Sequence, residues 1–363
     1  MNLVEHNGSP HPLYKSIRFD DFDVTWAGAN PFRPGFCFGS DDGRLRFTDE
    51  EGNNAKTIAL SVSGEAINGI AGANNWWIGS SRGDVTLFWL ETGEPNKLAR
   101  MTIPTGAHGV VATPGGYAVA PLGRAGVLHF KPEFGTEQKI EIAHNEEKPI
   151  QFYKVAALRD PKGNDILAFA ARQDGVAIMP FPERVGTGNL FAAQFGSLDV
   201  VDVCALGAGS AETPFAAIGR DGTLILFRDA QTDKNPFIIK WDAIEGAVYR
   251  VLSSRGHVFI LTSKALYMLV NLGSRWRRND PIQGGTTLIL TIPVDAVDAN
   301  VCGDKYLLVV TADKVLRFDI DLMEQYKPHD SNGEFQDLVP TVLKLNREWL
   351  GLPQETRSLA GVA

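Results

Sequence analysis

Residues 36–47 read FCFGSDDGRLRF: a short apolar strand, a tight polar turn containing Gly43, and an alternating strand that ends on a bulky residue. A two-residue hairpin turn needs positive φ angles, which glycine adopts without steric cost. Leu45 and Phe47 share one face of the second strand, because side chains alternate along a β-strand. The stretch therefore predicts a β-hairpin with one face in a core.

The same pattern recurs along the chain with a period of about 40–50 residues, which is typical of a β-propeller. Five copies contain a turn glycine, and the last two have Ala265 and Lys314 near the equivalent place. The further copies are WWIGSSRGDVTLF (76–88), YAVAPLGRAGVLHF (117–130), AFAARQDGVAIMPF (168–181), FAAIGRDGTLILF (215–227), VFILTSKALYML (258–269) and LLVVTADKVLRF (307–318).

Each hairpin is flanked by two further strand-like stretches. In the second unit they read EAINGIAG (65–72) and KLARMTI (97–103). Four strands per unit predict an all-β fold: a single seven-bladed β-propeller of four-stranded antiparallel blades. The last unit lacks a fourth strand after Phe318, and Ser16–Asp20 is expected to supply it and so close the ring.

Three segments follow from this interpretation. Residues 1–15 form an N-terminal arm, residues 16–323 the propeller, and residues 324–363 a C-terminal extension. In the extension, Leu338, Val342, Leu345 and Trp349 stand at helical spacing, which predicts a short helix near 340–350. This helix packs either on the propeller or on a partner.

VTLFWLETGE (85–94) resembles the strand and turn that end a WD repeat. The Trp-Asp pair of that family is missing, since Phe88 and Trp89 stand here, and so is its Gly-His pair. The resemblance implies a propeller that serves as a scaffold for protein–protein interaction. Without the His–Asp hydrogen-bond network of the family, we expect apolar packing to supply most of the rigidity of the blades.

Composition and motifs narrow the function classes. The net charge is −8, so a generally basic nucleic-acid footprint is absent. Cys37, Cys204 and Cys302 lie far apart in apolar stretches, which favours buried free thiols. The G-x-S-x-G match at 79–83 falls in a hairpin turn, whereas a nucleophile elbow joins a strand to a helix. Nucleotide-binding motifs, signal-peptide features and long apolar spans are also missing, so we expect a cytoplasmic protein.

A cation recurs beside the hairpin turns and is the first candidate for a binding site. Such a ring would focus positive potential over the central opening, and guanidinium groups match carboxylates geometrically. We therefore expect the hairpin-turn face to bind an acidic peptide or protein surface. The alternative is that these are ordinary solvated turns with neighbouring acids. The residues are Arg82, Arg124, Arg172, Arg220, Lys264 and Lys314.

A second candidate is the run Arg275, Trp276 and Arg277, expected in a loop between strands of the sixth unit. Tryptophan and arginine dominate the energetics of many interfaces, so the run could anchor a partner. The alternative is that it packs against the outer wall of the propeller.

A non-catalytic scaffold or adaptor that binds a protein partner is the function we expect, with no cofactor or metal assigned. Two alternatives remain open, because a fold does not determine a function. One is a metal-dependent lactonase-like or lyase-like enzyme that uses polar groups around the central channel. The other is a nucleic-acid-binding propeller that uses the cation ring.

Overall fold

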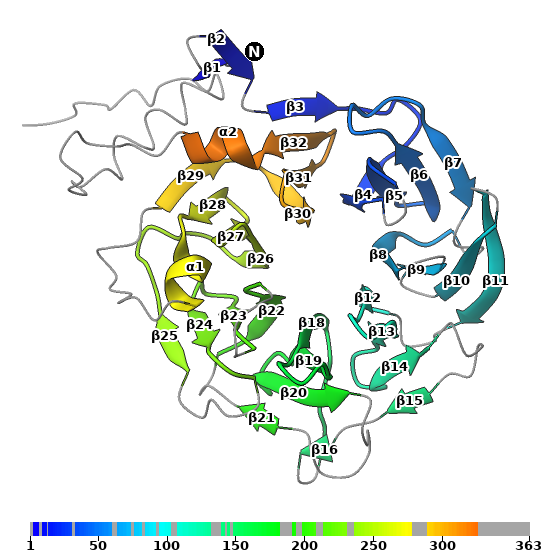
Figure 1. The fold of residues 1–363 in the computed structure, drawn as a ribbon, viewed down its shortest axis with the longest axis vertical. Coiled ribbons are helices and arrows are strands. Elements are labelled where there is room, and N and C mark those ends of the chain that lie inside the picture. The colour runs from blue at the N-terminus through cyan, green and yellow to red at the C-terminus, as the bar shows by residue number, and fades with distance from the viewer. Residues whose placement is uncertain are drawn as a thin grey trace, which may run out of the picture.

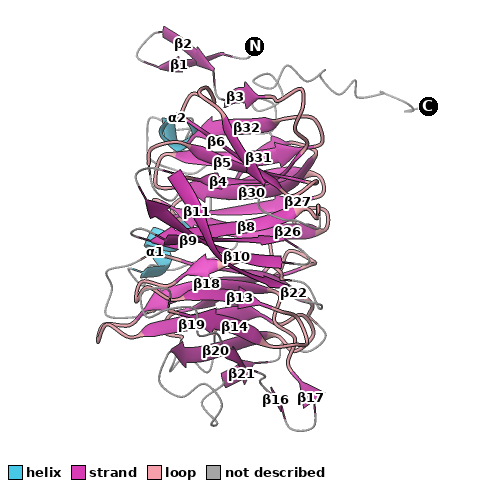
Figure 2. Cartoon of the chain, turned by 90° about the vertical axis from the view of Figure 1, so that its right-hand side faces the viewer, coloured by secondary structure: helices cyan, strands magenta, loops and turns pink. Residues whose placement is uncertain are grey.

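The strands form sheets arranged as a ring around a central axis (Figure 1). The computed structural model describes residues 3–325 except 7–8, 13, 31–32, 60–63, 74–75, 82–83, 92–93, 103–106, 132–138, 142–143, 146–147, 182–190, 194–197, 208–212, 231–235 and 278–288. Seen from the side, most strands run in similar directions, roughly along the central axis of the ring (Figure 2).

Within the described residues, six blades each consist of four antiparallel strands that are consecutive in sequence. From the axis outward, they are β4 (Val24–Ala29), β5 (Phe36–Ser40), β6 (Arg44–Thr48) and β7 (Lys56–Ala59); β8 (Ile67–Ala73), β9 (Trp76–Ser81), β10 (Asp84–Glu91) and β11 (Glu94–Thr102); β12 (Val111–Ala112), β13 (Ala118–Pro121), β14 (Val127–Phe130) and β15 (Lys139–Glu141); β18 (Lys154–Arg159), β19 (Asp165–Ala170), β20 (Val176–Phe181) and β21 (Phe191–Ala193); β22 (Val200–Ala205), β23 (Phe215–Gly219), β24 (Leu224–Phe227) and β25 (Phe237–Ile239); β26 (Val248–Ser254), β27 (His257–Thr262), β28 (Ala265–Leu269) and β29 (Ile289–Pro293).

The remaining four-stranded sheet is built from both ends of the described chain, and we call it the composite sheet. It joins β3 (Tyr14–Ile17) to β32 (Val315–Asp319), β31 (Tyr306–Thr311) and β30 (Ala296–Cys302). Helix α2 (Ile320–Gln325) begins directly after β32, so the chain does not turn back to form a fourth strand there. The prediction of seven blades is corrected accordingly: the described chain supplies six continuous blades, and the composite sheet, built from both ends of the described chain, completes the ring.

The strand that completes the composite sheet differs from the predicted one. Tyr14 pairs with Phe318 and Ile17 with Val315, so the strand ends at Ile17, and Asp20 already lies in a turn. Two short hairpins lie outside the blades, β1 (Leu3–His6) with β2 (Ser9–Pro12), and β16 (His144–Asn145) with β17 (Lys148–Pro149). The helix predicted near 340–350 falls outside the described residues.

The hydrophobic core lies between neighbouring sheets. Phe259 of β27 and Phe318 of β32 are fully buried in one apolar cluster that joins their two sheets. Phe215 and Phe227 stack with ring centroids 4.2 Å apart in the layer between the β18–β21 and β22–β25 blades. Both faces of most sheets are thus covered, which explains strands that are apolar throughout.

Local predictions hold where the backbone alone determines them. Gly43, Gly175 and Gly222 have φ angles of 81°, 84° and 88°, as their hairpin turns require.

The three cysteines are buried and free. Burial raises the pKa of the Cys302 thiol to about 12, so this thiol stays protonated near neutral pH. In the described part of the chain, no helix has the length and apolar character needed to cross a membrane.

Candidate functional site

The innermost strands share an irregularity that shapes the centre of the ring. In β4, β8, β22, β26 and β30, one extra residue interrupts the pairing with the next strand outward. Such a β-bulge re-aims the neighbouring side chains. The bulged residues are Thr25, Asn68, Val201, Tyr249 and Val297, and all five line one cavity at the centre of the ring.

Two cavities lie along the axis. The one lined by the bulged residues has a volume of about 350 Å³, and we call it the mouth chamber. The other has a volume of about 270 Å³ and is lined by residues such as His108, Cys204 and Ser253. Asn68, Lys154 and Arg250 line both chambers, so these side chains lie where the two cavities adjoin.

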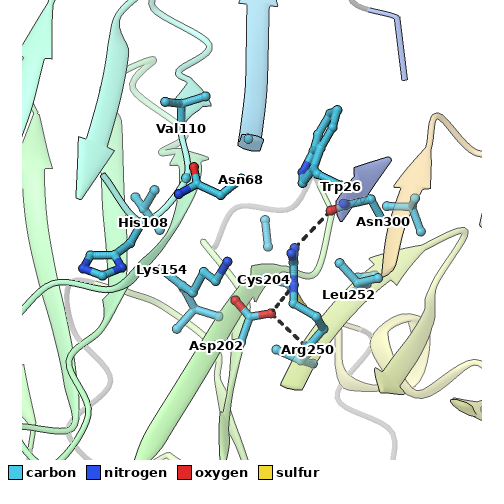
Figure 3. Close-up of a pocket in the computed structure, with 18 of the residues that line it drawn as sticks. Trp26, Asn68, His108, Val110, Lys154, Asp202, Cys204, Arg250, Leu252 and Asn300 are labelled. Atoms are coloured by element: carbon cyan, nitrogen blue, oxygen red, sulfur yellow. Dashed lines mark hydrogen bonds and ion pairs between the residues drawn. The ribbon is translucent and has the colours of Figure 1, made fainter. Parts of the chain in front are cut away.

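Arg250 connects three innermost strands. Its Nε donates to Asp202 Oδ2 at 2.9 Å on β22, and its Nη1 donates to Asp298 Oδ1 at 2.9 Å on β30. Its Nη2 donates to Asn300 Oδ1 at 3.0 Å, also on β30 (Figure 3). Burial alone would lower the pKa of Arg250, but the carboxylates of Asp298 and Asp202 outweigh it and raise that pKa. Arg250 is therefore a permanent cation whose charge is already matched.

Lys154 differs from Arg250 although it lies beside it. Its side chain points into the channel between Asn68 and Arg250 (Figure 3). Within the described part of the chain, its ammonium has no carboxylate within ion-pair distance. Burial, followed by the charge of Arg250, lowers the pKa of Lys154, and the more distant Asp298 and Asp202 offset part of this effect. The channel thus holds an ammonium group without a direct counter-ion.

Hydrogen bonds between blades form a polar belt around the channel. Asn300 Nδ2 donates to Ala27 O at 2.7 Å, Thr25 Oγ1 donates to Ile67 O at 3.0 Å, and Asn68 Nδ2 donates to Ala107 O at 2.6 Å. Each bond links an innermost segment to the next one around the ring.

Backbone bridges continue the belt on the other side of the ring. Gly123 exchanges hydrogen bonds with Phe152, and Arg172 does so with Val200. Val248 N donates to Arg220 O at 3.0 Å. These bonds link successive blades directly, in addition to the apolar packing between them.

Two of the predicted turn cations line the mouth chamber, namely Arg172 and Arg220. Both approach Asp199: the Arg220 Nε–Asp199 Oδ2 distance is 2.8 Å, and the Arg172 Nη1–Asp199 Oδ2 distance is 3.7 Å. Arg172 has a φ angle of 56° and lies over the ring of Tyr153, 4.7 Å from its centroid. The hairpin turns thus bring two of the predicted cations to the central opening.

Three further turn cations that the structure describes, Arg124, Lys264 and Lys314, do not line either chamber. Arg124 is exposed, Lys264 pairs with Glu245 at 2.9 Å, and Lys314 lies 3.6 Å from Asp313. Arg82 falls outside the described residues. The acids beside these turns neutralise much of the cation ring expected from the sequence.

The Arg275–Arg277 run lies in helix α1 (Leu272–Arg277) rather than in a loop. Trp276 is only 6% exposed and packs in a core cluster; its Nε1 donates to Phe227 O at 3.0 Å. Arg228 lies over the indole, 4.1 Å from the ring centroid. Of the two interpretations of this run, an exposed anchor and packing against the propeller, the structure shows packing for Trp276, because burial covers the apolar surface of the indole and its N–H group is hydrogen-bonded.

Sequence reasoning missed the charged residues of the innermost strands. Asp202 and Arg250 are 48 residues apart, and so are Arg250 and Asp298. The same interval separates Lys154 from Asp202. The signal that could have identified them is the recurrence of charged residues at a fixed interval inside apolar strands. A repeat with that interval places such residues at the same level of the central channel. In the described residues, no three acidic, histidine or cysteine side chains cluster to form a metal site.

No family model matches this sequence, and neither does any curated protein sequence. Solved structures do resemble it. One, described as YCF48 bound to D1 peptide, has a TM-score of 0.59 at 11% identity and covers 88% of this chain and 97% of that one. Another, the RRP9 WD40 repeats, has a TM-score of 0.62 at 13% identity, with coverages of 84% and 97%.

This chain has the fold of a WD40-type β-propeller. At these identities the likeness extends to the fold alone. The WD-repeat resemblance noted in residues 85–94 therefore agrees with the arrangement of the whole ring.

Proposed function

We propose that this propeller is a binding platform for a protein partner and that it takes an acidic peptide segment of that partner at the mouth chamber. One observation carries the proposal: four cations, Lys154, Arg172, Arg220 and Arg250, line this chamber in a protein whose net charge is −8. A concentration of positive charge in a concave opening steers and holds an anionic ligand.

The available donors support the proposal. In the described residues, Arg220 uses only its Nε toward Asp199, which leaves its two terminal nitrogens for a ligand. A guanidinium group presents these donors in a geometry that fits a carboxylate. One of the similar structures is described as bound to a peptide, and a propeller of that kind is therefore able to hold one.

Selection from a random peptide library displayed on phage tests the proposal. Wild-type protein is expected to enrich peptides rich in Asp and Glu. Fluorescence anisotropy should then show that the double variant Arg172→Gln/Arg220→Gln binds an enriched peptide about tenfold more weakly, because charge-assisted hydrogen bonds are lost.

Arg124→Gln is the matched control, since it removes an exposed turn cation that does not line the chamber. Its affinity for the enriched peptide should equal that of wild type. Selection without acidic enrichment, or an equal loss of affinity in the control, would refute a site at the mouth chamber.

A further inference from the structure

The charges at the mouth chamber do not cancel. Its four cations are opposed by three carboxylates: Asp298, which lines the chamber, and Asp202 and Asp199, which pair with the arginines. Arg250 is held by two of these carboxylates, and Arg172 and Arg220 share the third. These seven groups sum to one positive charge, which falls on Arg172 and Arg220 because they share a single carboxylate. Lys154 and Arg250 are matched in number by Asp202 and Asp298, but Lys154 is the cation without a direct ion pair among the described residues.

Lys154 can be reached from the mouth chamber, because it forms part of the wall of that chamber. A volume of about 350 Å³ is an order of magnitude larger than the roughly 30 Å³ that one water molecule occupies in the liquid. An aspartate or glutamate side chain therefore fits, together with water that bridges its second oxygen. An ammonium that has lost part of its hydration gains more from such a carboxylate than an exposed lysine does.

The rim of the chamber adds an apolar feature. Tyr249 and Val297 are 39% and 57% exposed, and they are two of the three large apolar side chains that stand out as exposed in the described residues. Both are bulged residues on the neighbouring strands β26 and β30, and both line the mouth chamber. An exposed apolar pair beside a cationic opening is suited to a ligand that carries both features.

From this arrangement we infer that the mouth chamber reads one acidic side chain of the bound peptide, which enters the channel and pairs with Lys154, while an adjacent apolar side chain packs on Tyr249 and Val297. The inference rests on the proposed function and adds the group that determines specificity. The ligand is then a protein segment with an acidic residue next to an apolar one. Because the charge of Arg250 is already matched, Lys154 is the cation that distinguishes an acidic side chain from a neutral one.

The test uses the acidic peptides that the phage selection enriches for the wild-type protein. For each peptide, every Asp or Glu is changed singly to Asn or Gln, and the affinities are measured with wild type, Lys154→Met and Lys154→Arg. One acidic position of the peptide should matter most. The peptide with the amide at this position should bind wild type about tenfold more weakly than the acidic peptide does, whereas Lys154→Met should bind both peptides equally.

Lys154→Arg keeps the charge and should keep most of the preference for the acid at that position. Val297→Ser should weaken binding of peptides with an apolar neighbour and leave the preference for the acid intact. Arg124→Met serves as the control for the loss of a cation elsewhere on the surface. Circular dichroism of each variant establishes that it is folded.

The outcomes separate the two proposals. If wild type and Lys154→Met show the same preference for the acid at every position, the inference about Lys154 is wrong while the platform function stands. If wild type selects no acidic peptide, both are wrong. If Lys154→Met loses the preference for the acid at one position only, the inference is supported.

Discussion

Arg250 donates hydrogen bonds to Asp202 and Asp298, whose side chains are 3% and 16% exposed. Changing Arg250 to Met leaves both carboxylates in the channel wall without their cation. Removing one partner of a buried ion pair costs about 3–5 kcal/mol of unfolding free energy. We expect Arg250→Met to lower stability by that amount, measured as denaturant-induced unfolding followed by tryptophan fluorescence.

The triple variant Arg250→Met/Asp202→Asn/Asp298→Asn is the control for this prediction. It removes the unpaired charges along with the arginine, so it should be more stable than Arg250→Met alone. If the single and triple variants lose the same stability, the ion pairs are not what Arg250 contributes.

Replacing Lys154, unlike replacing Arg250, should raise the stability of the protein. Folding lowers its pKa, chiefly through burial, so the unfolded chain binds this proton more tightly than the folded protein does. The charged lysine therefore destabilises the fold at neutral pH, and Lys154→Met should melt at a higher temperature than wild type. The advantage should shrink as the pH rises toward 10.5, the usual lysine value, and should disappear above it, because wild type then no longer carries the charge in either state.

Thermal melts of both proteins across the alkaline pH range measure this difference. A variant that melts below wild type at neutral pH would contradict the prediction. A constant advantage at every pH would show that the change acts through packing and not through the charge.

At the scale of single elements, the buried His257 holds two helices against β27. Asn271 N donates to His257 Nδ1 at 2.9 Å, so the ring proton sits on Nε2, which faces Glu324 Oε1 at 2.6 Å. Asn271 immediately precedes α1, and Glu324 lies in α2. One neutral imidazole thus satisfies a backbone donor at one helix and a carboxylate at the other.

His257→Leu should remove both contacts while keeping apolar volume. We expect the free energy of unfolding to fall by about 1–3 kcal/mol, because buried polar groups lose their hydrogen-bond partner. Native-state hydrogen exchange should show faster exchange at Asn271 and in α2, with no change in the β12–β15 blade on the far side of the ring. Glu324→Gln, which keeps an acceptor oxygen, should have a smaller effect. Uniform acceleration across all blades would contradict a local role.

The sequence predicted the hairpins better than the connections between them. Gly43 and Gly222 define tight turns through their backbone alone, and these turns form where expected. Helix α1 was expected as a loop, because six residues are too few to show helical periodicity. The bulges that place Tyr249 and Val297 at the channel mouth depend on pairing with a neighbouring strand, which the sequence of one strand does not encode.

At the scale of the whole molecule, the sequence indicated the ring but not the proposed binding site at its centre. Hairpin turns were expected to converge on one face, and Arg172 and Arg220 do lie at the mouth chamber. The acids that pair with turn cations, such as Asp199 and Glu245, lie about twenty residues away in sequence, and only folding brings them together. The charged environment of Lys154 is formed by residues of three other sheets, so its role could not be recognised from its own repeat.

The composite sheet makes the integrity of the ring depend on β3. Tyr14 packs its ring 5.6 Å from that of Phe318, and Ile17 is only 5% exposed. The ion pairs Lys15–Glu51 at 2.7 Å and Arg18–Asp313 at 3.1 Å flank the strand. Removing residues 1–17 would expose β32 as an open edge strand, which favours association between molecules.

We therefore expect deletion of residues 1–17 to lower stability by about 2–5 kcal/mol from the loss of buried Ile17 contacts alone, and to cause concentration-dependent association. Thermal melts and size-exclusion chromatography with light scattering measure the two effects. Deletion of residues 1–12 is the matched control: it removes the β1–β2 hairpin but keeps β3, and it should behave as the full chain does. Should both deletions melt alike and keep the same mass at every concentration, the six continuous blades would hold the ring closed without the N-terminal strand, and β3 would be an addition to the ring and not its closure.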